Sequence, residues 1–335
     1  MAEIVVSFNE ALAVAVAALK ARGASAAHAQ ATGRALVTAE AEGNRAVGLS
    51  HLFTYGDALA DGRALGDAEP VIEEITGASI RVDAREGLPH LGFERALARL
   101  VDGARSHGVS VLALRNGYPC GALGYFARRL AEDHGLAALV AANAGPAVMA
   151  ASGGKARVFC TNPIAFAAPA GGEAGEGSPA LVVDQSSSSS SLANLRAAAE
   201  AGREIPEGWA LDPAGHPTTD ARAALAGSLL PFGGARGANV ALMVELLAAG
   251  LTGANWSKDA PPYNKGSASP GAGLFILAMD PPEGFAPRLR DWIAAVSAEE
   301  GVYLPGLAKG ETLGHARHRG VHMDSGLWTR IRDLG

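Results

Sequence analysis

The chain of 335 residues has few of the features that hold small secreted proteins together. Its two cysteines, Cys120 and Cys160, are too few for a disulfide framework or a thiolate zinc cluster. The N-terminal segment carries acidic residues where an export signal is basic, so no export signal is evident. These absences favour a reducing compartment, and we expect the protein in the cytoplasm.

Runs of basic residues and uninterrupted apolar stretches are also absent. The formal charge is −6, without a cluster of lysine or arginine, which argues against binding to nucleic-acid phosphates. The longest uncharged stretch, 135–154, reaches the length of a membrane span, but Asn143, Pro146 and paired glycines interrupt it. It reads as a buried strand and a turn. We expect a small-molecule partner, no nucleic acid and no membrane.

Hydrophobic residues make up 48% of the chain, enough for a large core, and the length predicts two domains. Apolar residues recur at helical spacing from about 10 to 62, which predicts a small helical unit. Beyond it, β-branched runs alternate with helical patterns, as in a layered α/β core. Strands are predicted at 78–84, 109–116, 136–145, 178–185 and 273–281, and helices at 92–108, 122–135, 192–202, 238–253 and 286–300.

Three segments carry more specific expectations. The Gly/Glu-rich segment 171–179 has the composition of an exposed loop. The polar segment 203–227 contains three prolines and is expected to form an irregular surface loop. The segment 238–253 is almost wholly apolar, which predicts a helix buried on most sides.

The usual nucleotide and nucleophile motifs are missing: no G-x-G-x-x-G follows a strand, and no P-loop or G-x-S-x-G elbow occurs. Gly233, Gly234 and Gly237 surround Arg236 just before the apolar helix. Such a loop either holds a pyrophosphate with backbone N–H groups and a guanidinium, or makes a tight entry into a buried helix. Sequence alone leaves both readings open.

Other polar groups are ambiguous when taken singly. The run 186–191 places several serine hydroxyls at a helix start, where they can cap the helix, bind phosphate or form a flexible loop. Asp184 ends a strand, and His51 and Tyr55 share one helix face. The histidines of 315–322 alternate with arginines that would repel a cation, so we expect no metal site.

Several segments together resemble the type 2 malate/L-lactate dehydrogenase family of NAD(P)-dependent oxidoreductases. The matching segments occur in the family's order along nearly the whole chain. The longest of them, 229–257, is most similar to the cyclic ketimine reductase branch. The matching segments are YGDALADG (55–62), TNPIAFAAP (161–169), IPEGWALD (205–212), PTTD (217–220), LLPFGGARGANVALMVELLAAGLTGANWS (229–257) and YLPG (303–306).

This resemblance implies an α/β fold of the α+β kind, with a non-Rossmann nucleotide domain on a large, mainly antiparallel sheet and a helical domain. It implies a helical domain at 1–70, joined by the C-terminal segment 285–335, a sheet domain at 71–284, and a homodimer. The cofactor is NADPH or NADH, with NADPH favoured by the ketimine branch. The implied cofactor-binding residues are Thr161, Asn162, Ser186, Ser187, Ser188, Gly233, Gly234, Arg236, Gly237, Pro305 and Gly306.

The chain departs from the family where proton transfer is expected. The family's Asp-Ser-His-Gly motif aligns with residues 45–48, so Val47 replaces the histidine. His51 occupies the position at which the family has an arginine that binds the substrate carboxylate. A second family histidine falls within 116–121, where this chain has none. Tyr118 and His51 remain as candidate catalytic donors, with Tyr55, His90, Cys120 and Asp184 as candidate substrate-binding residues.

These replacements bear on the reaction. Reducing a ketone requires a general acid that donates a proton to the developing alkoxide. Loss of the family histidines that serve as this acid slows the reaction on the order of a hundredfold or more. A protonated imine has no such need, so we expect reduction of a small imino acid or cyclic ketimine. Two alternatives stay open: a 2-hydroxy acid dehydrogenase in which another residue such as His90 serves as acid, and a non-catalytic dinucleotide-binding protein.

Overall fold

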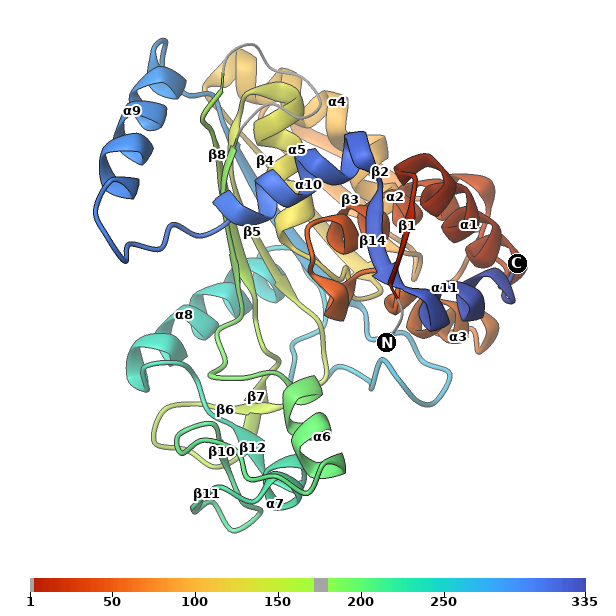
Figure 1. Cartoon of the computed structure of the whole chain (residues 1–335), viewed down its shortest axis with the longest axis vertical. Coiled ribbons are helices and arrows are strands. Elements are labelled where there is room, and N and C mark those ends of the chain that lie inside the picture. Colours follow the sequence, from red (N-terminus) through yellow and green to blue (C-terminus); the bar gives the residue numbers. More distant parts are fainter. Residues whose placement is uncertain (1–2, 172–179) are drawn as a thin grey trace.

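The computed structural model describes residues 3–171 and 180–335. The loop predicted at 171–179 lies, except for Gly171, outside the described residues. Within the described part, no helix combines the length and apolar character that crossing a bilayer requires. The chain forms a large sheet with helices against it, a helical part and a small second sheet (Figure 1).

A seven-stranded sheet in the order β2-β3-β4-β13-β5-β8-β9 is the centre of the molecule. All neighbours pair antiparallel except β3 and β4, which confirms the expected mainly antiparallel sheet. The central strands β13 and β5 are buried along almost their whole length, as their continuous apolar runs require. The strands are β2 (Val71–Thr76), β3 (Ser79–Asp83), β4 (Val109–Gly117), β5 (Ala137–Asn143), β8 (Ile164–Pro169), β9 (Ala180–Gln185) and β13 (Ala272–Met279).

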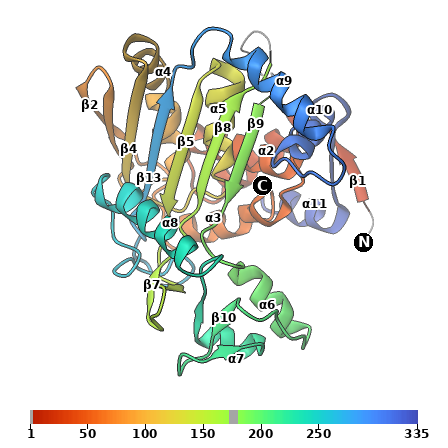
Figure 2. The same cartoon turned by 90° about the vertical axis from the view of Figure 1, so that its left-hand side faces the viewer.

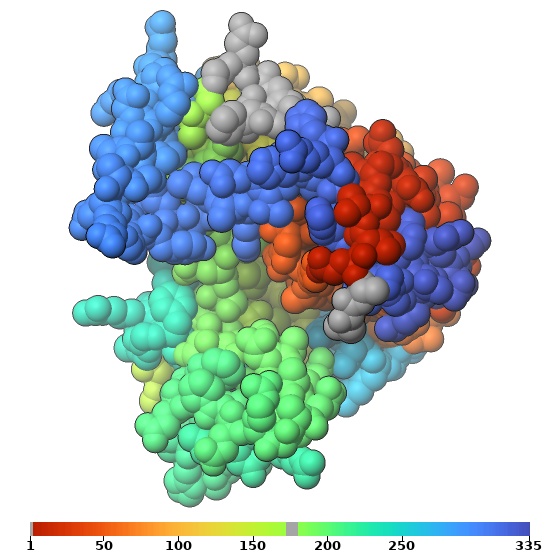
Figure 3. Space-filling view, in the orientation of Figure 1, coloured from red at the N-terminus to blue at the C-terminus, as the bar shows by residue number. Residues whose placement is uncertain are grey.

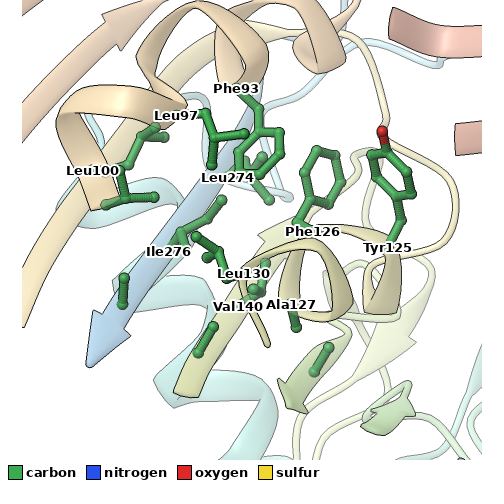
Figure 4. Close-up of a cluster of buried hydrophobic side chains, with 14 of the residues drawn as sticks. Phe93, Leu97, Leu100, Tyr125, Phe126, Ala127, Leu130, Val140, Leu274 and Ile276 are labelled. Atoms are coloured by element: carbon green, nitrogen blue, oxygen red, sulfur yellow. The ribbon is translucent and has the colours of Figure 1, made fainter. Parts of the chain in front are cut away.

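Two helices, α4 (Pro89–His107) and α5 (Gly124–His134), cover one face of this sheet. Each ends at a glycine with positive φ, Gly108 and Gly135, as the sequence predicts for helix stops. Their apolar faces meet β5 and β13 in the main core, where aromatic and aliphatic side chains interdigitate (Figure 4). This core fixes where the loops at the ends of β4 and β9 lie.

The opposite face carries α8 (Ala235–Glu245), which continues as a π-helical turn at Leu246–Gly250. Figure 2 shows α8 across one end of the sheet and α9 (Phe285–Ser297) near its other end. The expectation that this apolar helix is buried on most sides is wrong, because Leu242, Met243 and Leu246 are each about half exposed. One side of α8 packs on the sheet, and an apolar side faces outward.

Both ends of the chain share a second core. The helices α1 (Phe8–Ala21), α2 (Ala26–Ala41) and α3 (His51–Ala60), with a 3₁₀ turn at Arg45–Val47, pack with C-terminal residues in one buried cluster. We keep the division at about residue 70 as a proposal, which this shared cluster supports. The C-terminal elements are α10 (Leu307–Arg319), β14 (Val321–Asp324) and α11 (Ser325–Arg332), and β14 pairs with β1 (Glu3–Val6).

The segments between β5 and β8 and between β9 and β13 form a small unit with its own core, which is the green bulge in Figure 3. The segment 203–227, expected only to wander over the surface, contributes two short strands and a helix to it. Strands of two or three residues carry too little periodicity to be read from sequence. The elements are β6 (Met149–Ala150), β7 (Arg157–Phe159), α6 (Leu192–Glu200), β10 (Ala210–Leu211), β11 (Pro217–Thr218), α7 (Ala221–Ala226) and β12 (Ser228–Leu229).

Candidate active site

Three of the residues singled out from the sequence surround a fourth, Tyr55 on α3. The ring centroid of Tyr55 lies 5.7 Å from His51, 6.1 Å from His90 and 5.8 Å from Tyr118, each edge to face. These residues come from α3, the start of α4 and the end of β4. The structure therefore brings both candidate catalytic side chains and two of the four candidate substrate-binding side chains into one cluster.

Hydrogen bonds from this cluster hold the segment after β4. The Tyr55 hydroxyl donates to the carbonyl of Pro119 at 3.0 Å, and His90 Nε2 lies 3.0 Å from the carbonyl of Cys120. Because a carbonyl only accepts, Nε2 carries the proton and Thr32 Oγ1, at 3.3 Å, donates to Nδ1. Burial lowers the pKa of His90 to about 4, so His90 is neutral at physiological pH and positions this segment.

Tyr118 has a polar environment that the sequence did not reveal. Its hydroxyl donates to the carbonyl of Tyr263 at 2.8 Å and lies 3.4 Å from Arg63 Nη1. Arg63 is buried and also donates to the Tyr263 carbonyl. Burial raises the pKa of Tyr118 to about 12, despite the opposing effect of Arg63. Tyr118 therefore stays protonated, and the Tyr263 carbonyl accepts its one hydroxyl proton.

The turn that carries the family's catalytic motif has no ionisable group at position 47. Val47 ends the 3₁₀ turn, and Arg45 within it pairs with Glu3 at 3.0 Å. His51 begins α3 and is partly buried, and desolvation lowers its pKa below the ordinary value. Near neutral pH His51 is thus largely an uncharged imidazole against Tyr55.

Asp184 lies at the end of β9 and caps α5, because its Oδ2 accepts the backbone N–H of Gly124 at 2.8 Å. Burial raises the pKa of Asp184 and is also the main cause that raises the pKa of Cys120 to about 12, with the Asp184 charge second. A cavity of about 10 Å³ lies between Tyr118, Cys120 and Asn143. It holds about one water molecule, much less than a substrate.

Three of the candidate cofactor-binding segments come together next to the start of β8 and the end of β9. Ser187 N–H donates to the carbonyl of Thr161 at 2.8 Å, and Ser187 Oγ donates to the carbonyl of Asn162 at 2.7 Å. The carbonyl of Ser187 in turn accepts the N–H of Phe232 at 3.0 Å, directly before Gly233. Three segments far apart in the sequence thus form one hydrogen-bonded strip, which ends at the glycine loop.

The glycine loop forms a tight helix entry at one glycine and leaves open space at two others. Gly237 provides the tight helix entry, since a Cβ there would lie 2.0 Å from the carbonyl oxygen of Phe232. Gly233 and Gly234 instead have positive φ and open space where a Cβ would lie, beside a pocket of about 380 Å³. Arg236 is exposed in the first turn of α8. Free N–H groups at a helix start with a nearby guanidinium make an anion site.

Some of the candidate cofactor-binding side chains face inward. Asn162 and Ser187 are fully buried and hydrogen-bonded to protein groups, so in this conformation only their neighbours can reach a ligand. Ser186 and Ser188 hydroxyls lie 3.0 Å from each other. Gly306 follows Pro305 at the start of α10 and touches β9, because a Cβ there would lie 2.1 Å from the carbonyl oxygen of Val182.

The histidine-rich segment lies elsewhere on the surface. His315 and His322 line a depression of about 300 Å³ together with Arg45 and Arg319. Among residues 3–171 and 180–335, no three histidine, cysteine or acidic side chains are grouped to hold a metal ion.

Comparison with known proteins agrees with the fold and the motifs. The family model described as malate/L-lactate dehydrogenase matches residues 6–332. The chain belongs to this family of NAD(P)-dependent oxidoreductases, and it is an oxidoreductase.

Three relatives illustrate the similarity. A (2R)-3-sulfolactate dehydrogenase (NADP(+)) from Chromohalobacter salexigens is 41% identical over 305 residues, 90% of this chain and 89% of the relative. Delta(1)-pyrroline-2-carboxylate reductase 1 from Burkholderia ambifaria is 32% identical over 341 residues, 100% of this chain and 98% of the relative. The crystal structure of delta1-piperideine-2-carboxylate reductase from Pseudomonas syringae superposes with a TM-score of 0.91 and 32% identity, covering 99% of this chain and 100% of that one.

Proposed function

We propose that the protein reduces a small imino acid or cyclic ketimine to an amino acid with NAD(P)H. The observation that carries this proposal is the pairing of two features: an open glycine loop at the start of α8, and an aliphatic Val47 where the family has its histidine. The similarity to pyrroline- and piperideine-2-carboxylate reductases supports the same substrate class.

The chemistry of the site favours a substrate that arrives with its proton. A reduced nicotinamide supplies a hydride, and addition to a C=NH⁺ carbon gives a neutral amine without an alkoxide. His51 and His90 are largely neutral near pH 7, and Tyr118 has a pKa of about 12. These groups orient a substrate by hydrogen bonding better than they deliver a proton to an alkoxide.

The proposed roles follow from placement. Either His51, or Tyr118 in exchange for its bond to the Tyr263 carbonyl, donates a hydrogen bond to the substrate, and Tyr55, His90, Cys120 and Asp184 shape and hold the surrounding segment. The cofactor-binding residues comprise the strip Thr161, Asn162, Ser186, Ser187 and Ser188, the loop Gly233, Gly234, Arg236 and Gly237, and the turn Pro305 and Gly306. We propose NADPH as the preferred coenzyme, in line with the sulfolactate relative, whose name specifies NADP(+).

One observation favours a second candidate, reduction of a 2-keto acid to a 2-hydroxy acid. The sulfolactate dehydrogenase relative has 41% identity to this chain, against 32% for the ketimine reductase described above. In this case a hydroxyl or imidazole of the Tyr55 cluster must supply the alkoxide proton.

A substrate comparison separates the two candidates. Turnover is followed at the reduced-nicotinamide absorbance band with delta-1-pyrroline-2-carboxylate, delta-1-piperideine-2-carboxylate, 3-sulfopyruvate, pyruvate and oxaloacetate, each with NADPH and NADH. The proposal expects kcat/KM for a cyclic imine to exceed that for every keto acid. The reverse order supports the second candidate, and no turnover combined with saturable coenzyme binding supports a non-catalytic dinucleotide-binding protein.

Two variants test the proton donors. pH–rate profiles are compared for the wild type, Tyr118→Phe and His51→Ala. A donor that acts in the reaction changes kcat or the profile when removed. Unchanged profiles in both variants would remove these residues from the mechanism.

We also propose a homodimer. The outward side chains Leu242, Met243, Leu246 and Leu251, here called the α8 patch, are about half exposed or more, and Phe166 is exposed on the same face of the sheet. Apolar surface of this kind marks an interface. Light scattering should give twice 33.9 kDa for the wild type and a lower mass for Leu246→Glu, with Leu65→Glu in the helical part as control.

We propose a cytoplasmic location as well. Cys120 and Cys160 are both buried and free, which fits a reducing compartment.

A further inference from the structure

Glu245, the last residue of α8, is a buried carboxylate that the reaction proposed above does not use. It is 5% exposed. Its Oε2 accepts Asn162 Nδ2 at 2.8 Å and Ser257 Oγ at 2.7 Å, and its Oε1 accepts the N–H of Ser257 at 2.6 Å. A buried carboxylate with three donors is held firmly, and the donors are held with it.

Asn162 is the partner with a special backbone. Its φ is +39°, in the left-handed region that residues other than glycine adopt at a cost. Its side chain has no exposure, and the amide nitrogen donates both to Glu245 and to the carbonyl of Ala241 at 2.9 Å. These two bonds hold the strained conformation in place.

The conformation of Asn162 sets the strip that leads to the glycine loop. Its carbonyl accepts Ser187 Oγ, and Ser187 in turn accepts the N–H of Phe232. Gly233 and Gly234 follow immediately. A line of hydrogen bonds therefore runs from Glu245 through Asn162 and Ser187 to the proposed anion site.

Helix α8 connects the same two points a second way. Its start carries the glycine loop and its end carries Glu245, about 16 Å away at the rise of an α-helix. Glu245 is thus too distant to touch a dinucleotide phosphate at the loop. Immediately after Glu245 the helix changes to a π-helical turn, a feature found frequently at functional sites.

We infer that Glu245 is a positioning residue, which holds Asn162 and through it the serine strip and glycine loop in the conformation that binds the dinucleotide. The inference rests on the proposed NAD(P)H site and assigns to this carboxylate a role in coenzyme affinity rather than in proton transfer.

The test compares Glu245→Gln with Glu132→Gln. Glu132 is also buried, but it accepts hydrogen bonds from Arg128 at 2.6 Å and Arg317 at 3.2 Å on α5 and α10, away from the strip. In Glu245→Gln an NH₂ group replaces one of the two acceptor oxygens. It cannot accept the hydrogen bonds that Asn162 and Ser257 donate to that oxygen. We expect the Kd for NADPH, measured by nicotinamide fluorescence, to rise about 10- to 100-fold in Glu245→Gln, while kcat at saturating NADPH falls less than about threefold.

The control separates positioning from general stability. Glu132→Gln should lower the thermal midpoint of the free protein with a Kd within about twofold of wild type. In Glu245→Gln the rise in midpoint on adding NADPH should shrink. An unchanged Kd in Glu245→Gln, or an equal rise in Glu132→Gln, overturns the inference.

Asn162→Gly keeps the test decisive if Glu245→Gln does not fold. Glycine adopts the positive φ freely but cannot contact Glu245. We expect its Kd for NADPH to rise about tenfold or more, and an unchanged Kd contradicts the inference. Wild-type protein that binds neither coenzyme contradicts the proposed function itself, whereas binding by wild type with unchanged variants contradicts only the role of Glu245.

Discussion

The buried imidazole of His90 should make the stability of this protein depend on pH in a way that one substitution removes. Burial lowers its pKa from 6.5 to about 4. The unfolded chain therefore binds a proton before the folded protein does. The resulting stability is present above pH 6.5 and is lost as the pH falls toward 4. The full difference corresponds to about 3 kcal/mol, and about 2 kcal/mol of it is lost between pH 7.5 and pH 5.

The assay is urea unfolding of the wild type and His90→Gln at pH 7.5 and pH 5. Glutamine does not titrate, so the free energy of unfolding of the variant should fall by about 2 kcal/mol less than that of the wild type over this interval. His28 and His51, whose pKa values burial also lowers, are present in both proteins and cancel in the comparison. Equal losses in both proteins would show that His90 is not the neutral, buried imidazole described above.

Three further substitutions test other parts of the structure. Gly237→Ala places a Cβ 2.0 Å from the Phe232 carbonyl and should destabilise by more than about 2 kcal/mol in urea unfolding, whereas Gly314→Ala, with nothing within 4 Å, should be neutral or stabilising by up to about 1 kcal/mol. Arg236→Ala should raise the Kd for NADPH about tenfold and weaken its dependence on salt, and an unchanged salt dependence would exclude a phosphate contact. Arg128→Met leaves Glu42 without its cation and Glu132 with Arg317 alone, and should cost about 3–5 kcal/mol of unfolding free energy, and a loss below about 1 kcal/mol would contradict the buried ion network.

The large sheet and its covering helices were predictable because their signals are local. The strands at 109–117, 137–143 and 272–279 are continuous apolar runs, and α4 and α5 end at glycines. The small second sheet was missed because its strands have two or three residues. The pairing of β1 with β14 was missed because nothing local indicates a contact between the two ends of the chain.

In the candidate site, too, only the features with a local sequence signal could be predicted. The glycine loop and the serine run are visible as composition, and the family resemblance indicated that they belong together. Arg63 and Tyr263 act on Tyr118 across 55 and 145 residues, and Glu245 acts on Asn162 across 83. The exposed side of α8 was also misjudged, because an apolar sequence does not reveal which of its side chains the rest of the chain covers.

Transfer of deuterium from NADPH that carries two deuterium atoms at nicotinamide carbon 4 tests the central claim most directly. The protein is incubated with labelled NADPH and delta-1-piperideine-2-carboxylate in unlabelled water, and the amino acid product is analysed by mass spectrometry and NMR. The proposed reaction predicts one deuterium at carbon 2 of the product for each NADPH oxidised. An amino acid without deuterium at carbon 2, or no amino acid product with either coenzyme, would contradict it.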